Sequence, residues 1–412
     1  MEELLYLVHR IPYPPNKGDK IRSYHLLKHL AQSYRVHVGA FIDDANDWQY
    51  ADALTKLAGG EIKLLPLNPR AATLKSAIGL ATGEPLSLPY YRDSRMQAWV
   101  GSMLATRPIS RALVYSSSMA QYLMQQRQLR RVIDFVDIDS DKWRQYAEKK
   151  SWPMSWVYRR EARTLFQYEQ RVTQEFAAAA FVSDAEADLF KKLAPACAAK
   201  VFGFSNGVDT AFFSPEHVFD SPYAQGEQVL VFTGAMDYWA NVDAVSWFAR
   251  DIFPQVQRAL PTARFYIVGS RPSAEVQALS AIDGVVVTGT VADTRPYIAH
   301  AALAVAPLRI ARGIQNKVLE AMAMAKAVVA TPEAAEGIRT QDEAALQVAQ
   351  GASAFAEKII ALLTGDAAQP IGAAARACVL RDYAWEAHLT RLDQSLSGPS
   401  AHAAVSLQEV AV

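Results

Sequence analysis

Residues 309 to 330 read RIARGIQNKVLEAMAMAKAVVA, a stretch that passes from a basic loop into a helix and then a buried strand. The spacing of Leu319, Met322 and Ala323 predicts the buried face of the helix, and the final VVA predicts the strand. We expect Asn316 to be the N-cap, because asparagine accepts hydrogen bonds from the unpaired N–H groups of a first helical turn. The stretch is therefore typical of a parallel sheet covered by helices.

The same stretch has the chemistry of a phosphate site. A helix N-terminus carries a positive partial charge and unpaired N–H donors, and Arg309, Arg312, Gly313 and Lys317 precede or open this one. Glu320 shares a helix face with Lys317, where a carboxylate can accept hydrogen bonds from sugar hydroxyls. The pattern indicates a site for a nucleotide diphosphate-sugar. The alternative is a surface ion pair between Lys317 and Glu320, worth ~0.2–0.5 kcal/mol.

Strand candidates alternate with helices through the rest of the chain. In the first half they lie at 4–8, 35–41, 62–67, 112–116, 131–136 and 177–183, and in the second half at 228–234, 263–269, 284–289, 302–308 and 327–331. This alternation predicts an α/β fold with two Rossmann-like, doubly wound parallel-sheet domains facing a cleft. We expect an N-terminal domain at 1–207, a C-terminal domain at 208–384 and a disordered tail at 398–412. Residues 381–396 read as a final helix, and its part at 385–397 is expected to pack on the first domain.

Composition excludes several classes of protein. The 412 residues are 51% hydrophobic and 20% charged, which is ordinary for a globular chain with more than one core. Lys+Arg and Asp+Glu are equal at 42 each, so no basic field favours nucleic acid. Cys197 and Cys378 form no metal-ligand pattern and no disulfide framework, which fits the cytoplasm. No apolar run reaches the ~18 residues of a membrane span, so any membrane contact is expected to be peripheral.

Several separated motifs resemble glycosyltransferase family 4. They are the early loop ending at Gly18, VSDAEADLF (182–190), SNGVD (205–209), FTGAMDYWANVDAVSWF (232–248), GIQNKVLEAMAMAKAVV (313–329) and YAW (383–385). The resemblance implies the GT-B architecture and a retaining, metal-independent transferase, with the nucleotide-sugar donor in the C-terminal domain and the acceptor in the N-terminal domain. More narrowly, HRIPYPPNKGDKIRSYHLL (9–27), VIDFVDIDSDKW (132–143) and RGIQNKVLEAMAMAK (312–326) are similar to sugar transferases associated with exosortase and PEP-CTERM exopolysaccharide systems.

The resemblance also implies roles for individual donor-side residues. Glu320 matches the acid that binds the donor ribose, and Lys317 is placed to hold the diphosphate. The backbone N–H groups of Val318 and Leu319 add to the phosphate site. The nucleobase is expected at the position of Gly289 and Val291.

Two departures from the family pattern lie in this region. Arg312 stands where relatives often have an acid that contacts the donor sugar, and the loop GAMDYWAN (234–241) lacks the arginine and lysine that often clamp the phosphates. Our hypothesis is that Arg309 and Arg312 provide this clamp instead. One charge-assisted hydrogen bond contributes ~1.5–3 kcal/mol.

Acceptor-side candidates come from the first half. Asp137 and Asp139 form a DxD pattern, which can bind a divalent ion, but a strand-end turn or helix N-cap is the simpler interpretation. Asp137 is also a candidate for binding or deprotonating the acceptor hydroxyl. Gly18 and Asp19 are candidates for an acceptor contact, with a loop-to-helix junction as the alternative. His25 and His29 are interpreted as ordinary helix-surface histidines.

Residues 141–171 hold eight Lys/Arg against four Asp/Glu, with Trp143, Trp152 and Trp156 interleaved. This segment is either a contact with an anionic membrane near a lipid-linked acceptor or a solvated charged face. A separate stripe is predicted to be core: Leu165, Tyr168, Val172 and Phe176.

The sequence favours a glycosyltransferase of the cytoplasm, at or near the inner face of its membrane, that acts in exopolysaccharide synthesis on a glycan or lipid-linked acceptor. Two alternatives stay open. One is a nucleotide-sugar 2-epimerase of the same fold, for which Asp237 is the main support. The other is a nucleotide-sugar-binding protein without turnover.

Overall fold

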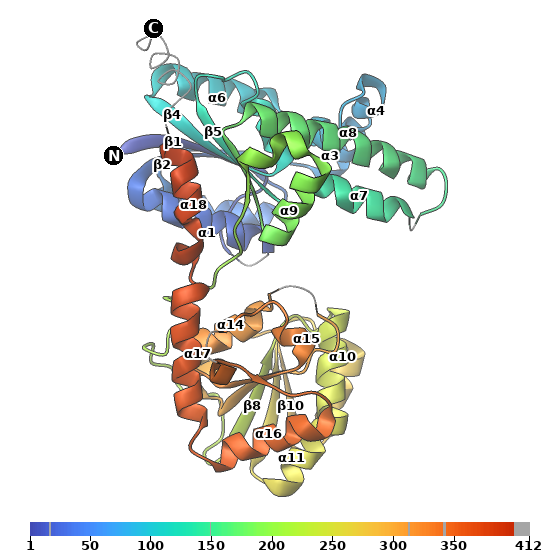
Figure 1. Ribbon diagram of the computed structural model, residues 1–412, viewed down its shortest axis with the longest axis vertical. Coiled ribbons are helices and arrows are strands. Elements are labelled where there is room, and N and C mark those ends of the chain that lie inside the picture. The colour runs from blue at the N-terminus through green and yellow to red at the C-terminus, as the bar shows by residue number, and fades with distance from the viewer. Residues whose placement is uncertain (16–17, 149, 312–313, 341–342, 399–412) are drawn as a thin grey trace. The chain divides into compact units, whose positions relative to one another are not determined.

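The computed structural model describes residues 1–15, 18–148, 150–311, 314–340 and 343–398. The chain divides into two compact units (Figure 1): residues 1–206 with the segment from His388 onward, and Gly207–Ala387. Each unit contains its own parallel sheet and its own buried apolar cluster. The expected boundary at 207/208 lies one residue from the first division, and the second division falls inside helix α18 (Trp385–Ser397).

The N-terminal unit is built on a seven-stranded sheet of order β3-β2-β1-β4-β5-β6-β7, and all its strand pairs are parallel. The strands are β1 (Glu2–Val8), β2 (Tyr34–Ile42), β3 (Gly59–Pro66), β4 (Ile109–Tyr115), β5 (Arg130–Val136), β6 (Ala178–Phe181) and β7 (Val201–Gly203). The strand order reverses between β1 and β4. Such a switch point is where doubly wound sheets bind ligands.

Helices flank this sheet (Figure 1). They are α1 (Gly18–Ser33), η1 (Ala45–Tyr50), α2 (Ala51–Ala58), α3 (Pro69–Ser76), α4 (Ile78–Thr82), α5 (Ser87–Tyr91), α6 (Ser94–Thr106), η2 (Ser117–Tyr122), α7 (Asp139–Glu148), α8 (Met154–Glu175), α9 (Asp184–Leu193) and η3 (Pro195–Lys200).

Helix α18 belongs to this unit through side-chain contacts. Asp393 lies 2.8 Å from Nε2 of His29, and the guanidinium of Arg111 donates to the carbonyl of Leu396 at 2.9 Å. His29 is therefore part of a helix-to-helix contact. His25 is only 7% exposed, so its interpretation as a surface histidine is wrong.

The C-terminal unit contains a six-stranded parallel sheet of order β10-β9-β8-β11-β12-β13. The strands are β8 (Gln228–Thr233), β9 (Ala263–Val268), β10 (Val285–Gly289), β11 (Leu303–Ala306), β12 (Val328–Ala330) and β13 (Gln347–Val348). Its helical segments are α10 (Trp239–Trp247), the π-helical η4 (Phe248–Ile252), α11 (Phe253–Ala259), α12 (Ala274–Ala278), η5 (Leu279–Ala281), α13 (Arg295–His300), α14 (Asn316–Ala323), α15 (Pro332–Ala335), η6 (Glu343–Ala345), α16 (Ala352–Thr364) and α17 (Ala368–Asp382).

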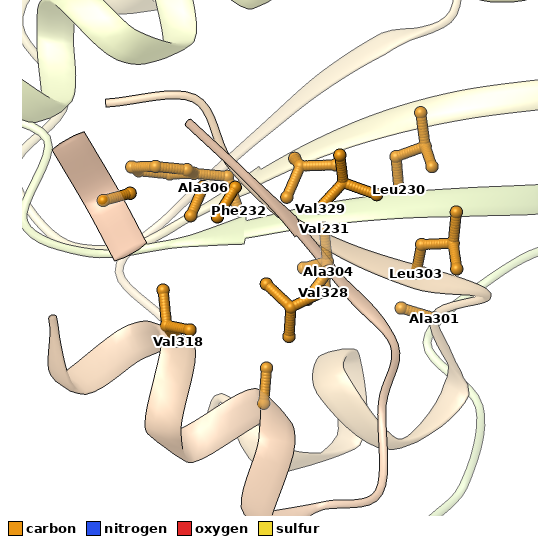
Figure 2. Close-up of a cluster of buried hydrophobic side chains, with 14 of the residues drawn as sticks. Leu230, Val231, Phe232, Ala301, Leu303, Ala304, Ala306, Val318, Val328 and Val329 are labelled. Atoms are coloured by element: carbon orange, nitrogen blue, oxygen red, sulfur yellow. The ribbon is translucent and has the colours of Figure 1, made fainter. Parts of the chain in front are cut away.

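The core of this unit fixes α14 on the sheet. Val318 of α14 points toward the side chains of β8, β11 and β12, as Figure 2 shows. Both Val318 and Leu319 are 1% exposed, which confirms the predicted buried face of this helix. The switch point of the sheet lies between β8 and β11, and α14 follows β11 along the chain.

The final helix predicted at 381–396 is confirmed from residue 385, but its predicted start at 381 is wrong. Helix α17 ends at Asp382 and α18 begins at Trp385. The amide of Val208 donates to the carbonyl of Tyr383 at 2.8 Å, and Val208 also forms an isolated parallel bridge with Ala384. This pairing fixes the short turn at 383–384 that separates the two helices. Among the described residues, no helix is both long enough and apolar enough to cross a membrane.

Candidate functional site

Two glycines bring the backbone ends of β8 and β9 together at the carboxyl edge of the C-terminal sheet. A Cβ on Gly269 would lie 2.8 Å from the carbonyl carbon of Gly234 and even closer to its oxygen. A Cβ on Gly234 would lie 2.8 Å from Nδ2 of Asn241 and 3.3 Å from Nζ of Lys317. Gly269 must be glycine because a Cβ there would overlap the Gly234 backbone, whereas a Cβ on Gly234 would press on the ends of the Asn241 and Lys317 side chains. The ends of β8 and β9 are therefore tightly packed beside the switch point.

Helix α14 begins over these strand ends. Its N-cap is Gln315, with φ −92° and ψ 102° and no side-chain cap, so the predicted N-cap at Asn316 is wrong. Asn316 is already helical and its side chain is exposed. The N–H groups of Val318 and Leu319 donate to the Gln315 carbonyl at 3.0 and 3.3 Å. Within the described residues, the first-turn N–H groups without a partner are instead those of Asn316 and Lys317.

Lys317 points from α14 onto the end of β8. Its Nζ lies 2.5 Å from Oδ1 of Asn241 on α10 and 4.1 Å from the centroid of the Phe232 ring. Asn241 is oriented in turn, because its Nδ2 donates to the Ala235 carbonyl at 2.9 Å. Burial lowers the pKa of Lys317 to about 7, and the nearby Glu320 carboxylate opposes this shift. A lysine held in this way can gain or lose its proton near neutral pH.

Glu320 lies one turn further along α14. Burial raises its pKa to about 7, with Lys317 opposing the shift. Lys317 and Glu320 form no ion pair, and among the described residues the Glu320 carboxylate has no hydrogen-bond partner. The surface ion-pair interpretation is therefore wrong. A part-buried carboxylate without a partner carries a desolvation cost that hydroxyl donors of a ligand would offset.

Arg309 is already paired. Its Nε lies 3.0 Å from Oδ2 of Asp243 on α10, and its guanidinium lies 5.4 Å from the centroid of the Trp247 ring. A phosphate would have to compete with Asp243 for this cation. Arg312 and Gly313 lie outside the described residues.

Gly289 and Val291 lie at the carboxyl end of β10, on the same sheet edge as Gly234. Gly289 has φ +71°, a conformation that favours glycine, and its carbonyl accepts a hydrogen bond from Gly269 at 3.3 Å. Val291 packs partly buried against the core of the unit.

The acceptor-side candidates lie at the carboxyl edge of the N-terminal sheet. Asp137 follows β5 directly, after Val136, whose φ of +72° is rare for a β-branched residue. Nζ of Lys142 lies 2.6 Å from Asp137 and 3.2 Å from Asp139, so one lysine serves both acids of the DxD pattern. Within the described residues, no three His, Cys, Asp or Glu side chains gather as a metal site would require. Gly18 and Asp19 open α1, where their side chains are outside the described part.

The segment 141–171 forms the helices α7 and α8, which pack on each other (Figure 1). The predicted core stripe is confirmed: Leu165, Val172 and Phe176 are buried, and Tyr168 packs against them. Trp152 and Trp156 are 80% and 57% exposed. Arg160 differs from the expected charged surface, because it is buried and donates to the Glu84 carbonyl at 3.1 Å.

The partners of Lys317 were not found from the sequence. Asn241, Phe232 and Gly234 are more than 70 residues away along the chain, and only the neighbouring positions of β8 and β11 bring them to α14. A signal was present, since Asn241 is the last residue of GAMDYWAN (234–241), the segment that lacks the expected cations. An amide there leaves room for a lysine from another element.

Residues 227–365 match the family described as "Glycosyl transferases group 1". The match covers under half of the chain, but it includes β8, α14, Lys317 and Glu320. The candidate site thus lies in the segment that matches the group 1 glycosyl transferases. No curated protein sequence matches the chain.

Solved structures resemble the chain over nearly its whole length. Sucrose-phosphate synthase from Thermosynechococcus elongatus is 16% identical, with 95% of this chain and 98% of that one covered and a TM-score of 0.61. Anabaena Alr3699/HepE, solved with UDP and glucose, is 15% identical, with 97% and 100% covered and a TM-score of 0.60. WaaG, a glycosyltransferase involved in lipopolysaccharide biosynthesis, is 14% identical, with 96% and 100% covered and a TM-score of 0.59. The predicted GT-B fold with two Rossmann-like domains is confirmed.

Proposed function

We propose that this protein transfers a sugar from a nucleotide-diphosphate sugar to a glycan or lipid-linked acceptor, with retention and without a metal ion. The observation that carries the proposal is the pair Lys317 and Glu320 at the start of α14. Lys317 can be protonated or neutral near pH 7, and the Glu320 carboxylate has no partner among the described residues. Both lie beside the closely packed ends of β8 and β9. The group 1 match over this segment and the UDP bound by Anabaena HepE support the same donor class.

In this proposal the diphosphate, the ribose and the nucleobase of the nucleotide-sugar each have a partner in the protein. Protonated Lys317 and the unpaired N–H groups of Asn316 and Lys317 bind the diphosphate, and Glu320 accepts from the ribose hydroxyls. The nucleobase lies near Gly289 and Val291. The acceptor oxygen attacks the anomeric carbon on the face from which the diphosphate departs, and its proton passes to a diphosphate oxygen. The protein contributes positioning and stabilisation of the charge that develops on the phosphate.

The deciding experiment incubates the protein with a panel of nucleotide-sugars and follows donor hydrolysis and product identity. Hydrolysis to the free sugar and nucleoside diphosphate is expected, and it should fall at least tenfold in Lys317→Met and Glu320→Gln. Arg250→Ala is the control, because Arg250 is exposed on η4 away from this pair. A 2-epimer as product would establish the epimerase alternative. Tight binding without any product would establish a binding protein.

The arginine clamp has a separate test. Arg309→Ala and Arg312→Ala should each weaken nucleoside diphosphate binding by one to two decades, the size of one charge-assisted hydrogen bond. Unchanged donor affinity and turnover in Arg312→Ala would contradict the clamp. Asp243→Asn is the matched variant, since removing the acid that pairs with Arg309 should strengthen binding if Arg309 contacts phosphate.

The acceptor side is proposed to involve Asp137, with Gly18 and Asp19 near it. Asp137→Asn should lower sugar transfer more than donor binding, and equal losses in both would contradict this role. A role in exopolysaccharide synthesis at the inner face of the cytoplasmic membrane is proposed from the sequence motifs. Exposed Trp152 and Trp156 support a membrane contact. Replacing both with serine should then reduce sedimentation with phosphatidylglycerol vesicles.

A further inference from the structure

A cavity of about 310 Å³ lies in the N-terminal unit where α7, α8 and the end of α9 meet. Its volume is at the lower end of the range for small-molecule sites. Ala162 and Phe166 of α8 and Leu193 of α9 provide an apolar wall. Leu193 is 46% exposed, so this wall opens toward solvent.

Two arginines without partners border this apolar wall. Arg159 and Arg163 both line the cavity and are exposed, four residues apart on the α8 face that carries Ala162 and Phe166. Neither makes a hydrogen bond or an ion pair among the described residues. Other arginines of the same hairpin differ: Nε of Arg144 lies 2.7 Å from Asp141, and Nε of Arg171 lies 2.9 Å from Glu175.

The acids near the cavity do not cancel this charge. Asp141 is engaged by Arg144 and by the side-chain amide of Gln145 at 2.7 Å. Glu169 lies one turn beyond Phe166 and accepts from the Ser140 hydroxyl at 2.6 Å. Burial raises the pKa of Glu169 to about 8, so it is mostly neutral at pH 7. The cavity therefore combines an apolar wall with a net positive rim.

We propose that this cavity binds an anionic amphiphile, an alkyl or polyprenyl chain that bears a phosphate group. Arg159 and Arg163 bind the phosphate oxygens, and the chain lies against Phe166 and Leu193. Exposed Trp152 and Trp156, on the approach to α8 and in its first turn, offer the apolar surface over which such a ligand would arrive. As a binding site the inference stands on the cavity alone. As the site of the lipid-linked acceptor, it rests on the proposed function.

The test measures binding of monomeric dodecyl phosphate, below its micelle concentration, by calorimetry. We expect dodecyl phosphate to bind at least tenfold more tightly than inorganic phosphate or dodecyltrimethylammonium, because head and chain each contribute. The double variant Arg159→Ala/Arg163→Ala should lose at least tenfold in affinity. Arg127→Ala is the matched control, since Arg127 is an exposed arginine of the same unit outside the cavity. Ala162→Phe should also abolish binding by filling the cavity, although both arginines remain.

Several outcomes would overturn the site. They are unchanged affinity in the double arginine variant, equal binding of inorganic phosphate, and binding to phosphatidylglycerol vesicles without binding of the monomer. The two arginines are exposed, so thermal melting should show the double variant folded. Nucleotide-sugar hydrolysis should be the same in the parent and in all cavity variants. If no variant hydrolyses any donor while dodecyl phosphate still binds, the proposed function fails and the amphiphile site stands.

Discussion

Lys317 and Glu320 show how one helical turn can make a site responsive to pH. Both groups have pKa values brought to about 7 by burial, from 10.5 and 4.5, and each favours the charged form of the other. Without a ligand, the pair is held in a part-buried place at a free-energy cost. A nucleoside diphosphate would relieve that cost, because its phosphates favour protonated Lys317 and its ribose hydroxyls favour ionised Glu320.

The cost should be visible in stability. Between pH 4.5 and 7 the folded protein binds more protons than the unfolded chain through Glu320, so stability falls as the pH rises. Between pH 7 and 10.5 it binds fewer protons through Lys317, so stability rises again. The fall through Glu320 amounts to at most about 3 kcal/mol and the rise through Lys317 to at most about 5 kcal/mol, since one pKa unit corresponds to about 1.4 kcal/mol. Urea unfolding without nucleotide should show no fall in stability between pH 4.5 and 7 in Glu320→Gln. It should show no rise between pH 7 and 10.5 in Lys317→Met. Parallel pH profiles in all three proteins would contradict this account.

Ligand binding should also move a proton. At pH 8 Lys317 is mostly neutral, and a bound diphosphate raises its pKa, so UDP binding should take up close to one proton. Calorimetry in buffers with different ionisation enthalpies measures this uptake. Lys317→Met should bind UDP more weakly and take up none. An uptake that persists in this variant would assign the proton to another group.

At the scale of the elements, the packing of β8 against β9 depends on glycine. Gly269→Ala should destabilise the C-terminal unit by at least about 2 kcal/mol and abolish nucleotide binding, because its Cβ meets the Gly234 backbone. Gly101→Ala is the matched control in α6, where a Cβ meets nothing within 4 Å, and it should stabilise by about 0.5–1 kcal/mol. Thermal melts and UDP titrations compare the two. A Gly269→Ala protein as stable as the parent would show that β8 and β9 can move apart.

The sequence was sufficient for the long elements, because their apolar runs are continuous. Residues 4–8 are fully buried within β1, as expected of a central parallel strand. The strands β7 and β13 were not predicted, since VFG and QV are too short to show a period. The break at Tyr383 was missed because its cause, pairing with Val208, comes from a distant segment.

The candidate site was predictable in part. Lys317 and Glu320 follow from a local motif, and the structure places both at the start of α14. The lysine's contacts with Asn241 and Phe232 depend on how strands pair across the sheet, which a single sequence does not reveal. The N-cap was misplaced by one residue because Gln315, which lacks a capping bond, precedes a residue that usually provides one.

At the scale of the molecule, the two units have separate apolar cores. We therefore expect two calorimetric unfolding transitions. UDP at 100 times its Kd should stabilise the C-terminal unit by about 2.7 kcal/mol and raise only that transition. Glu320→Gln identifies which transition belongs to this unit, since only that one should move. A single transition that shifts as a whole would mean that the two units unfold together.

The order of the segments along the chain also affects how the protein is made. The N-terminal unit takes residues 1–206 first, but the part of α18 that belongs to it, from His388 onward, follows only after Gly207–Ala387. At the usual ~5–20 residues per second of synthesis, the ribosome needs roughly 10–40 s to add that intervening unit. During this time the nascent first unit lacks the partner of His29 and the carbonyl that Arg111 binds. It is therefore a candidate client for chaperones until the final helix emerges, although it is the first part of the chain to be translated.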